Sequence, residues 1–153
     1  MSNIVTLPLA CSKLLREKAR CKLSFAQIAS HIGHDEVWTA ALFYGRATPT
    51  LKDIHQLADL LNLSAESLED DFRMAGPPTR EVDVSGKTDP VVYPFQEAIA
   101  LYAPAIRTVI AEKLGDGAVC SAAMKVRVEK VSRAKGNDVR LVLESKHTPF
   151  QSW

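Results

Sequence analysis

The first 75 residues carry apolar side chains three and four positions apart, the spacing of short amphipathic helices. Ser24 and Gln27 form a capping-box pattern that predicts a helix over 25–32, and Gly33 is suited to end it in a left-handed conformation. Other helices are predicted around Leu9, Leu14, Leu15 and Ala19, and after the N-caps Asp35, Thr50 and Ser64, over 36–44, 51–61 and from 65 to near Phe72. Residues 1–75 are therefore predicted to form an N-terminal helical bundle.

The helical pattern stops at 76–90, where prolines and glycines alternate with charged residues in GPPTREVDVSGKTDP. This composition cannot continue a helix and buries little, so it predicts a linker. Asp89 and Pro90 then supply an N-cap and a first-turn proline for a long apolar-periodic helix that ends at Gly115. Pro104 lies deep inside this segment and predicts a kink, or two consecutive helices meeting near Ala103.

After Gly117 the apolar period changes from the helical value to two. Ala122, Met124, Val126 and Val128 alternate with more polar residues, which predicts a strand with one covered face, and KGND at 135–138 predicts a turn into a second strand, VRLVLES. A lone hairpin is marginally stable in water, and a C-terminal domain of residues 91–153 is small to stand alone. The pattern thus predicts an oligomer of an α+β, mostly α, chain: a helix-turn-helix-like helical domain, then a helix with a β-hairpin that needs a helix or another subunit to cover it.

Composition and charge restrict the class of protein further. The 153 residues carry 19 basic and 18 acidic side chains, for a formal net charge of +1, far from the strongly basic balance of many nucleic-acid binders. The cysteines, Cys11, Cys21 and Cys120, are odd in number and show no CxxC spacing, and the four histidines lack metal-ligand spacing. We expect a cytoplasmic protein without disulfides, bound metal, membrane segment or secretory signal.

A DNA-binding protein is the rival class, because two short helices at 25–32 and 36–44 meet at a tight glycine turn as in a helix-turn-helix. Residues 36–44, which would form the recognition helix, contain no Arg, Lys, Asn or Gln to read base edges. Residues 1–75 as a whole carry eight basic and nine acidic side chains, which gives little attraction for phosphates. DNA binding is therefore the less favoured alternative.

Three segments, in this order, resemble the cyanase (cyanate hydratase, or cyanate lyase) family. They are LSFAQIASHIGHDEVWTAALFYGRATP at 23–49, TDPVVYPFQE at 88–97, and EKLGDG at 112–117 with the hairpin that follows, and the likeness spans roughly residues 10–150. The resemblance implies a homodecamer, built as a ring of five dimers, in which the C-terminal helix and β-hairpin form the dimerisation domain. It implies active sites that combine residues from several subunits. It also implies a reaction in which bicarbonate attacks cyanate and the product breaks down to carbamate, ammonia and carbon dioxide, without a metal or organic cofactor.

The resemblance also implies which residues form the catalytic site. The family's Tyr-Arg-x-x-Glu pattern corresponds to Tyr93, Pro94, Phe95, Gln96 and Glu97, so the glutamate matches and a proline takes the place of the arginine. The family's serine position, five residues after Gly115, holds Cys120. Ser121 follows directly and is a possible stand-in.

These two departures bear on the chemistry, because cyanate and bicarbonate are both anions and their approach must be offset by a cation or oriented donors. Proline offers neither, whereas Arg107 or Arg127 could supply a substitute cation. Cys120 is either a packed, inert thiol, on the apolar face with Ala122 and Met124 by strand parity, or a nucleophile with new chemistry. The alternative to a cyanate hydratase is accordingly an inactive or repurposed paralogue that binds another small anion or electrophile.

Overall fold

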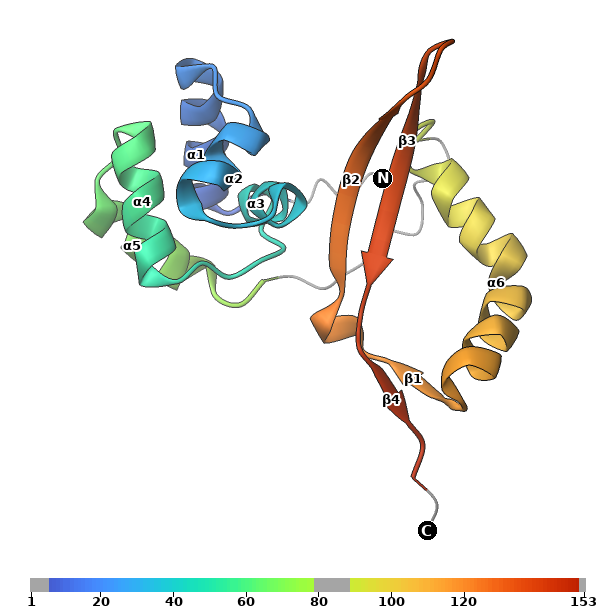
Figure 1. Cartoon of the computed structure of the whole chain (residues 1–153). Coiled ribbons are helices and arrows are strands. Elements are labelled where there is room, and N and C mark those ends of the chain that lie inside the picture. Colours follow the sequence, from blue (N-terminus) through green and yellow to red (C-terminus); the bar gives the residue numbers. More distant parts are fainter. Residues whose placement is uncertain (1–5, 79–88, 152–153) are drawn as a thin grey trace. The chain divides into compact units, whose positions relative to one another are not determined.

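The computed structural model describes residues 6–78 and 89–151, and it is an α+β fold that is mostly helical (Figure 1). The described residues fall into two compact units. One contains helices α1 to α5 and most of the hairpin β2–β3; the other contains α6, the short strands β1 and β4, and the 3₁₀ turn η1. Most of the predicted linker, residues 79–88, lies outside the described residues. Within residues 6–78 and 89–151, no helix is long and apolar enough to cross a membrane.

The predicted N-terminal helices are confirmed by five helices, which are α1 (Leu9–Cys21), α2 (Phe25–Ile32), α3 (Glu36–Phe43), α4 (Leu51–Leu61) and α5 (Ala65–Ala75). Their starts follow from local chemistry. Ser24 and Gln27 form the predicted capping box, with the Gln27 N–H donating to Ser24 Oγ at 3.1 Å, and Thr50 and Asp53 form a second one. Gly33, with φ +74°, ends α2 as predicted.

Two details of these helices differ from the sequence expectation. Asp35 stands at the N-cap of α3, but its side chain makes no capping hydrogen bond; instead its carbonyl accepts from the buried Thr39 hydroxyl at 2.9 Å. Helix α5 continues past Phe72 to Ala75, because no residue between them breaks it and Gly76 follows. Both differences are local to helix ends.

The helical body has one apolar core to which each of the five helices contributes. Its fully buried side chains include Leu14, Ile28, Phe43, Leu57 and Leu68, one from each helix in turn. An ion pair between Lys13 and Asp71 ties α1 to α5 at its edge. This core explains why the small body is well packed without help from the rest of the chain.

Helix α6 (Tyr93–Leu114) differs from the prediction at its start, and at Pro104 it shows the first of the two predicted forms, a bend in one helix (Figure 1). The helix begins at Tyr93, while Asp89 caps the turn before it by accepting from the Val91 and Val92 N–H groups at 2.8 and 3.1 Å. Pro104 does not divide the segment in two: it lies inside one helix, which Figure 1 shows bending along its length. Proline removes one backbone hydrogen bond and crowds the preceding turn, so bending without breaking is its ordinary effect.

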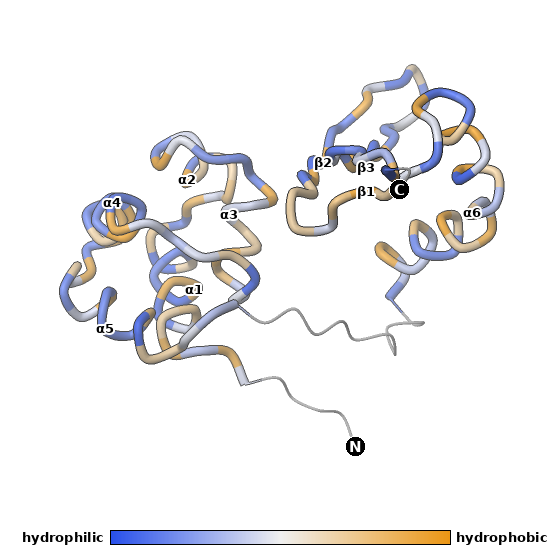
Figure 2. The backbone as a smooth tube through the Cα atoms, turned by 90° about the horizontal axis from the view of Figure 1, so that it is seen from below, coloured by the Kyte–Doolittle hydropathy of each residue, from blue (hydrophilic) through white to orange (hydrophobic). Residues whose placement is uncertain are grey.

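No residue of α6 is buried in the single chain. Leu101 and Tyr102 are 68% and 58% exposed, and Ile106, Val109 and Leu114 are also exposed. Figure 2 shows these apolar positions as orange segments along the helix. A helix of 22 residues with so much uncovered apolar surface is expected to pack against another chain.

The strand pattern was predicted correctly at its end and wrongly at its beginning. Strands β2 (Lys125–Ser132) and β3 (Asn137–Glu144) form the expected hairpin, with Gly136 at φ +89° in its turn. Residues 121–123, however, form η1 (Ser121–Ala123) rather than the start of the strand. Two short strands not predicted at all, β1 (Gly117–Val119) and β4 (His147–Pro149), pair antiparallel with Val119 opposite His147.

Candidate functional site

Pro94 and Glu97 lie in the first two turns of α6, and both are exposed. Pro94 is the second helical residue, a position where the missing N–H has no partner within the helix to lose. Proline is therefore well suited structurally to the position at which the sequence resemblance expects an arginine. The Glu97 side chain makes no hydrogen bond or ion pair with any residue in the described parts of the chain, so it is available to a ligand or to a neighbouring subunit.

Cys120 lies between β1 and η1, and its side chain is exposed. The expectation that it shares an apolar strand face with Ala122 and Met124 was wrong, because the chain turns into η1 at Ser121 and strand alternation begins only at Lys125. Ser121 is exposed as the first residue of η1. The side chains of Cys120 and Ser121 therefore lie at the turn between β1 and η1 and not along a strand.

Ser145 and Lys146 hold this turn in place through two hydrogen bonds to Cys120. The Cys120 N–H donates to the Lys146 carbonyl at 3.0 Å, and the Ser145 hydroxyl donates to the Cys120 carbonyl. These contacts could not be predicted from the sequence, since a three-residue strand has too few positions to show alternation.

Gly117 of β1 lies close to His147 of β4, the strand with which β1 pairs antiparallel. A Cβ on Gly117 would lie 2.4 Å from the Thr148 carbonyl oxygen and 2.6 Å from His147 Nε2, so only glycine fits. His147 Nε2 is itself buried and has no hydrogen-bond partner among residues 6–78 and 89–151. Glycine is thus required by close packing here, not by its backbone conformation.

The single chain does not bring Glu97 and Cys120 together. From Glu97 to Leu114 the helix advances by about 25 Å, at 1.5 Å per residue. In Figure 1, β1 joins the end of α6 opposite to the one that carries Glu97. Among the substitute cations considered, Arg107 lies exposed on α6 and Arg127 lies on β2. A site that uses both Glu97 and Cys120 must therefore draw on more than one chain.

Two exposed carboxylates, Asp89 and Glu97, lie at or near the start of α6. Hydrogen bonds from the Val92 and Val91 N–H groups lower the pKa of Asp89, which is fully exposed and stays ionised over the neutral range. Glu97 adds a second carboxylate two turns along.

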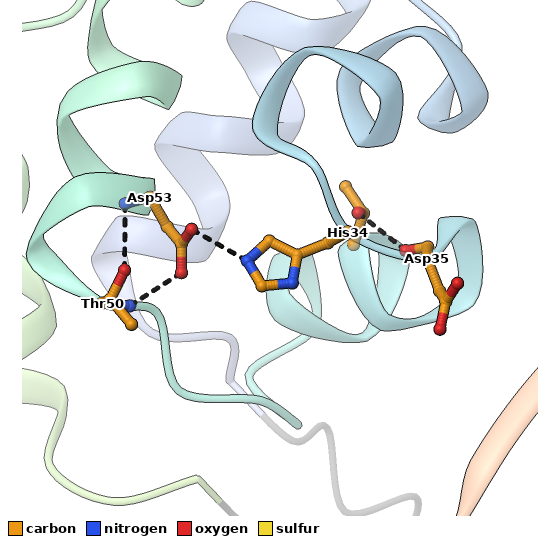
Figure 3. A network of polar contacts seen from close by, with 5 residues as sticks. His34, Asp35, Thr50 and Asp53 are labelled. Carbon is orange, nitrogen blue, oxygen red and sulfur yellow. Dashed lines mark hydrogen bonds and ion pairs between the residues drawn. The ribbon is translucent and has the colours of Figure 1, made fainter.

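A separate polar network links the α2–α3 turn to α4 in the helical body (Figure 3). His34 Nε2 lies 2.8 Å from Asp53 Oδ1, and Asp53 Oδ2 accepts from the Thr50 N–H at 2.9 Å. Burial alone would raise the pKa of Asp53, but these hydrogen bonds and the charge of His34 lower it overall. The imidazole of His34 also stacks on Trp38, with ring centres 3.9 Å apart. The network fixes three helices relative to one another.

The helical body also contains a cavity of about 370 Å³, lined by Cys11, Tyr44, Leu51, Ile54, Phe72 and others. None of the predicted site residues lines it. Among the described residues, no three His, Cys, Asp or Glu side chains cluster closely enough to hold a metal ion.

Comparisons with known proteins decide the family. A family model described as the cyanate lyase C-terminal domain matches residues 85–152. A cyanate hydratase of Laccaria bicolor is 38% identical over 152 residues, covering 99% of this chain and 92% of the relative, and one of Prochlorococcus marinus subsp. pastoris is 35% identical over 150 residues, covering 97% and 100%. The chain belongs to the cyanate hydratase family.

The fold of this cyanate hydratase-family chain is that of a solved relative. The crystal structure of a cyanase from T. urticae superposes with a TM-score of 0.78 at 23% identity, covering 92% of this chain and 97% of the other. Both the helical body and the α6–hairpin region thus have counterparts in one solved architecture. The resemblance noticed from the three sequence segments is confirmed.

Proposed function

We propose that this chain catalyses the bicarbonate-dependent decomposition of cyanate to ammonia and carbon dioxide. The observation that carries the proposal is the identity of 38% and 35% with two cyanate hydratases along almost the entire chain. Glu97 supports it, because this carboxylate stands at the family's glutamate position and is exposed without a partner in the described chain. Bicarbonate is the co-substrate, and no metal or organic cofactor is required.

The active form is a homodecamer, a pentamer of dimers in the cytoplasm, that binds the two small anions between subunits. Support comes from two features of the single chain. Helix α6 buries none of its residues, and it separates Glu97 from Cys120 by most of its length. Packing α6 against other copies would cover the apolar surface and would bring Glu97 of one chain near Cys120 of another.

The proposed catalysis is slower than that of relatives that keep the arginine. Pro94 has neither charge nor donor, and losing one preorganised donor costs on the order of 10² to 10³ in rate. Cys120 gives the site a thiol in place of a hydroxyl, which is a weaker hydrogen-bond donor. Arg107 and Arg127 are the candidates for a substitute cation, and each would have to reach the site within the assembly.

The test is ammonia release from cyanate plus bicarbonate by the purified protein, beside Pro94→Arg, Cys120→Ser and the double variant. We expect weak, bicarbonate-dependent release by the natural protein and a rise of about 10² with Pro94→Arg. No release from any of the four proteins, although each assembles, would contradict the proposal.

The second candidate is a repurposed or inactive paralogue that binds another small anion or electrophile. Pro94 and Cys120 favour it, because both catalytic positions other than Glu97 are changed. It predicts that the natural protein is silent and that only the double variant turns over. A natural protein that already releases ammonia would exclude it.

A further inference from the structure

We propose that Ser145 is a positioning residue whose hydroxyl holds the backbone of Cys120, and thereby the Cys120 thiol, in its place in the site. The inference rests on the proposed function, in which Cys120 lines the anion site. Ser145 does not touch the reacting atoms in this scheme; it acts through Cys120.

The register of β1 and β4 explains why a side chain is needed at this point. Gly117 pairs with Pro149 and Val119 with His147, and the next pair in the same register is Cys120 with Lys146, whose hydrogen bond of 3.0 Å is present. The following pair would set Ser121 opposite Ser145. That backbone pair does not form, because η1 turns the chain away at Ser121.

The Cys120 carbonyl is therefore the first acceptor beyond the end of the ladder. The Ser145 hydroxyl donates to it, so the Cys120 peptide groups are held on both sides, by the backbone of Lys146 and the side chain of Ser145. Ser145 is half-buried, whereas the thiol that it positions is exposed. With N–H and carbonyl both held, the direction of the Cα–Cβ bond of Cys120 is set, and the thiol is restricted to the rotamers about that bond.

The first measurement does not depend on catalysis. Hydrogen–deuterium exchange of peptides covering 117–124 is compared in the natural protein, Ser145→Ala and Ser145→Thr, all at the same state of assembly. Loss of one hydrogen bond is expected to accelerate exchange there by about 2- to 10-fold in Ser145→Ala, and Thr, which keeps the hydroxyl, should restore it. Peptides of the β2–β3 turn are the internal control. Unchanged exchange at 117–124 would overturn the proposal.

The second measurement tests whether the hydrogen bond from Ser145 to Cys120 affects catalysis. We expect kcat for cyanate to fall several-fold in Ser145→Ala with a smaller change in KM, and to recover in Ser145→Thr, because the thiol is displaced while Glu97 and the other groups of the proposed site remain. A natural kcat in Ser145→Ala, despite faster exchange, would make Ser145 merely structural and overturn the positioning role.

If the natural protein does not release ammonia, the proposed function is contradicted, and this result says nothing about the role of Ser145. The alkylation rate of Cys120 by iodoacetamide then replaces kcat, followed on the tryptic peptide 114–125, where Cys120 is the lone cysteine. A rate in Ser145→Ala that differs at least twofold from the natural protein, and returns with Thr, supports positioning; an equal rate overturns it. Cys11, whose thiol is buried with a raised pKa, is the control for intact folding.

Discussion

At the scale of single residues, the site consists of side chains that look unremarkable in the isolated chain. Glu97 is an exposed glutamate near a helix start, where its type is favoured by helix chemistry alone. Only the family resemblance distinguishes it from Glu112, the other exposed carboxylate of α6. Its role is therefore tested by a substitution that removes the negative charge and preserves the shape of the side chain.

Glu97→Gln should lower cyanate turnover by at least 10², because a carboxylate that moves or stabilises a proton typically contributes 10² to 10⁴ in rate. Glu112→Gln, on the same helix and equally exposed, is the matched control. Both variants are assayed for ammonia release after their assembly is checked by light scattering. Equal activity of the two variants would remove Glu97 from the mechanism.

Asp53 is the residue whose ionisation matters most for the helical body. It is 3% exposed, and its pKa is lowered in the folded chain, so its charged form stabilises the fold above the pKa it has when unfolded. That contribution is lost as the pH falls through the lower folded value. Asp53→Asn should reduce the free energy of unfolding at pH 7 by about 1–3 kcal/mol and flatten its fall between pH 5 and acid.

Urea unfolding followed by helical circular dichroism, at a fixed protein concentration and at several pH values, measures this effect. Asp59→Asn is the control, because Asp59 is exposed on the same helix. If the two variants have the same stability at pH 7, the network of Figure 3 contributes nothing to the fold.

At the scale of elements, the sequence predicted what is decided locally. The helices α2 and α4 were found because Ser24–Gln27 and Thr50–Asp53 satisfy helix ends within four residues. Strands β1 and β4 were missed because each has three residues and exists only through pairing with a segment some 30 residues away. Ala122 and Met124 are apolar residues two positions apart, as in a strand. Only the structure shows that the chain turns there, in η1.

Gly117→Ala tests whether the β1–β4 pair is an essential element. The added Cβ would lie 2.4 Å from a backbone oxygen of Thr148, which cannot move as a flexible side chain could, so the two strands must separate. We expect much faster deuterium exchange in peptides covering 117–120 and 147–150, and loss of turnover. Ala118→Ser, with a small exposed side chain on the same strand, should behave as the natural protein does. Natural exchange in Gly117→Ala would mean that the strands tolerate the shift.

At the scale of the whole molecule, the proposed site needs residues from more than one chain. The helical body has a core, but α6 buries no residue, and the proposed site residues Glu97 and Cys120 lie near opposite ends of that helix. The composition of the proposed site could not be predicted from local sequence patterns for the same reason, because no such pattern reports which side chains a second copy would supply. Assembly and activity should therefore be lost together.

Leu101→Asp is the direct test of this coupling. Leu101 is 68% exposed in the chain, so an aspartate there costs little in a monomer, but in the proposed decamer it would bury a charge against apolar surface. Light scattering at micromolar concentration should show a smaller species, and ammonia release should vanish with it. Lys113→Asp, which introduces the same side chain at a charged position of α6, should leave both unchanged. A Leu101→Asp protein that keeps its mass would place this face of α6 outside the interface, whereas one that is smaller yet active would show that the site is complete within fewer chains.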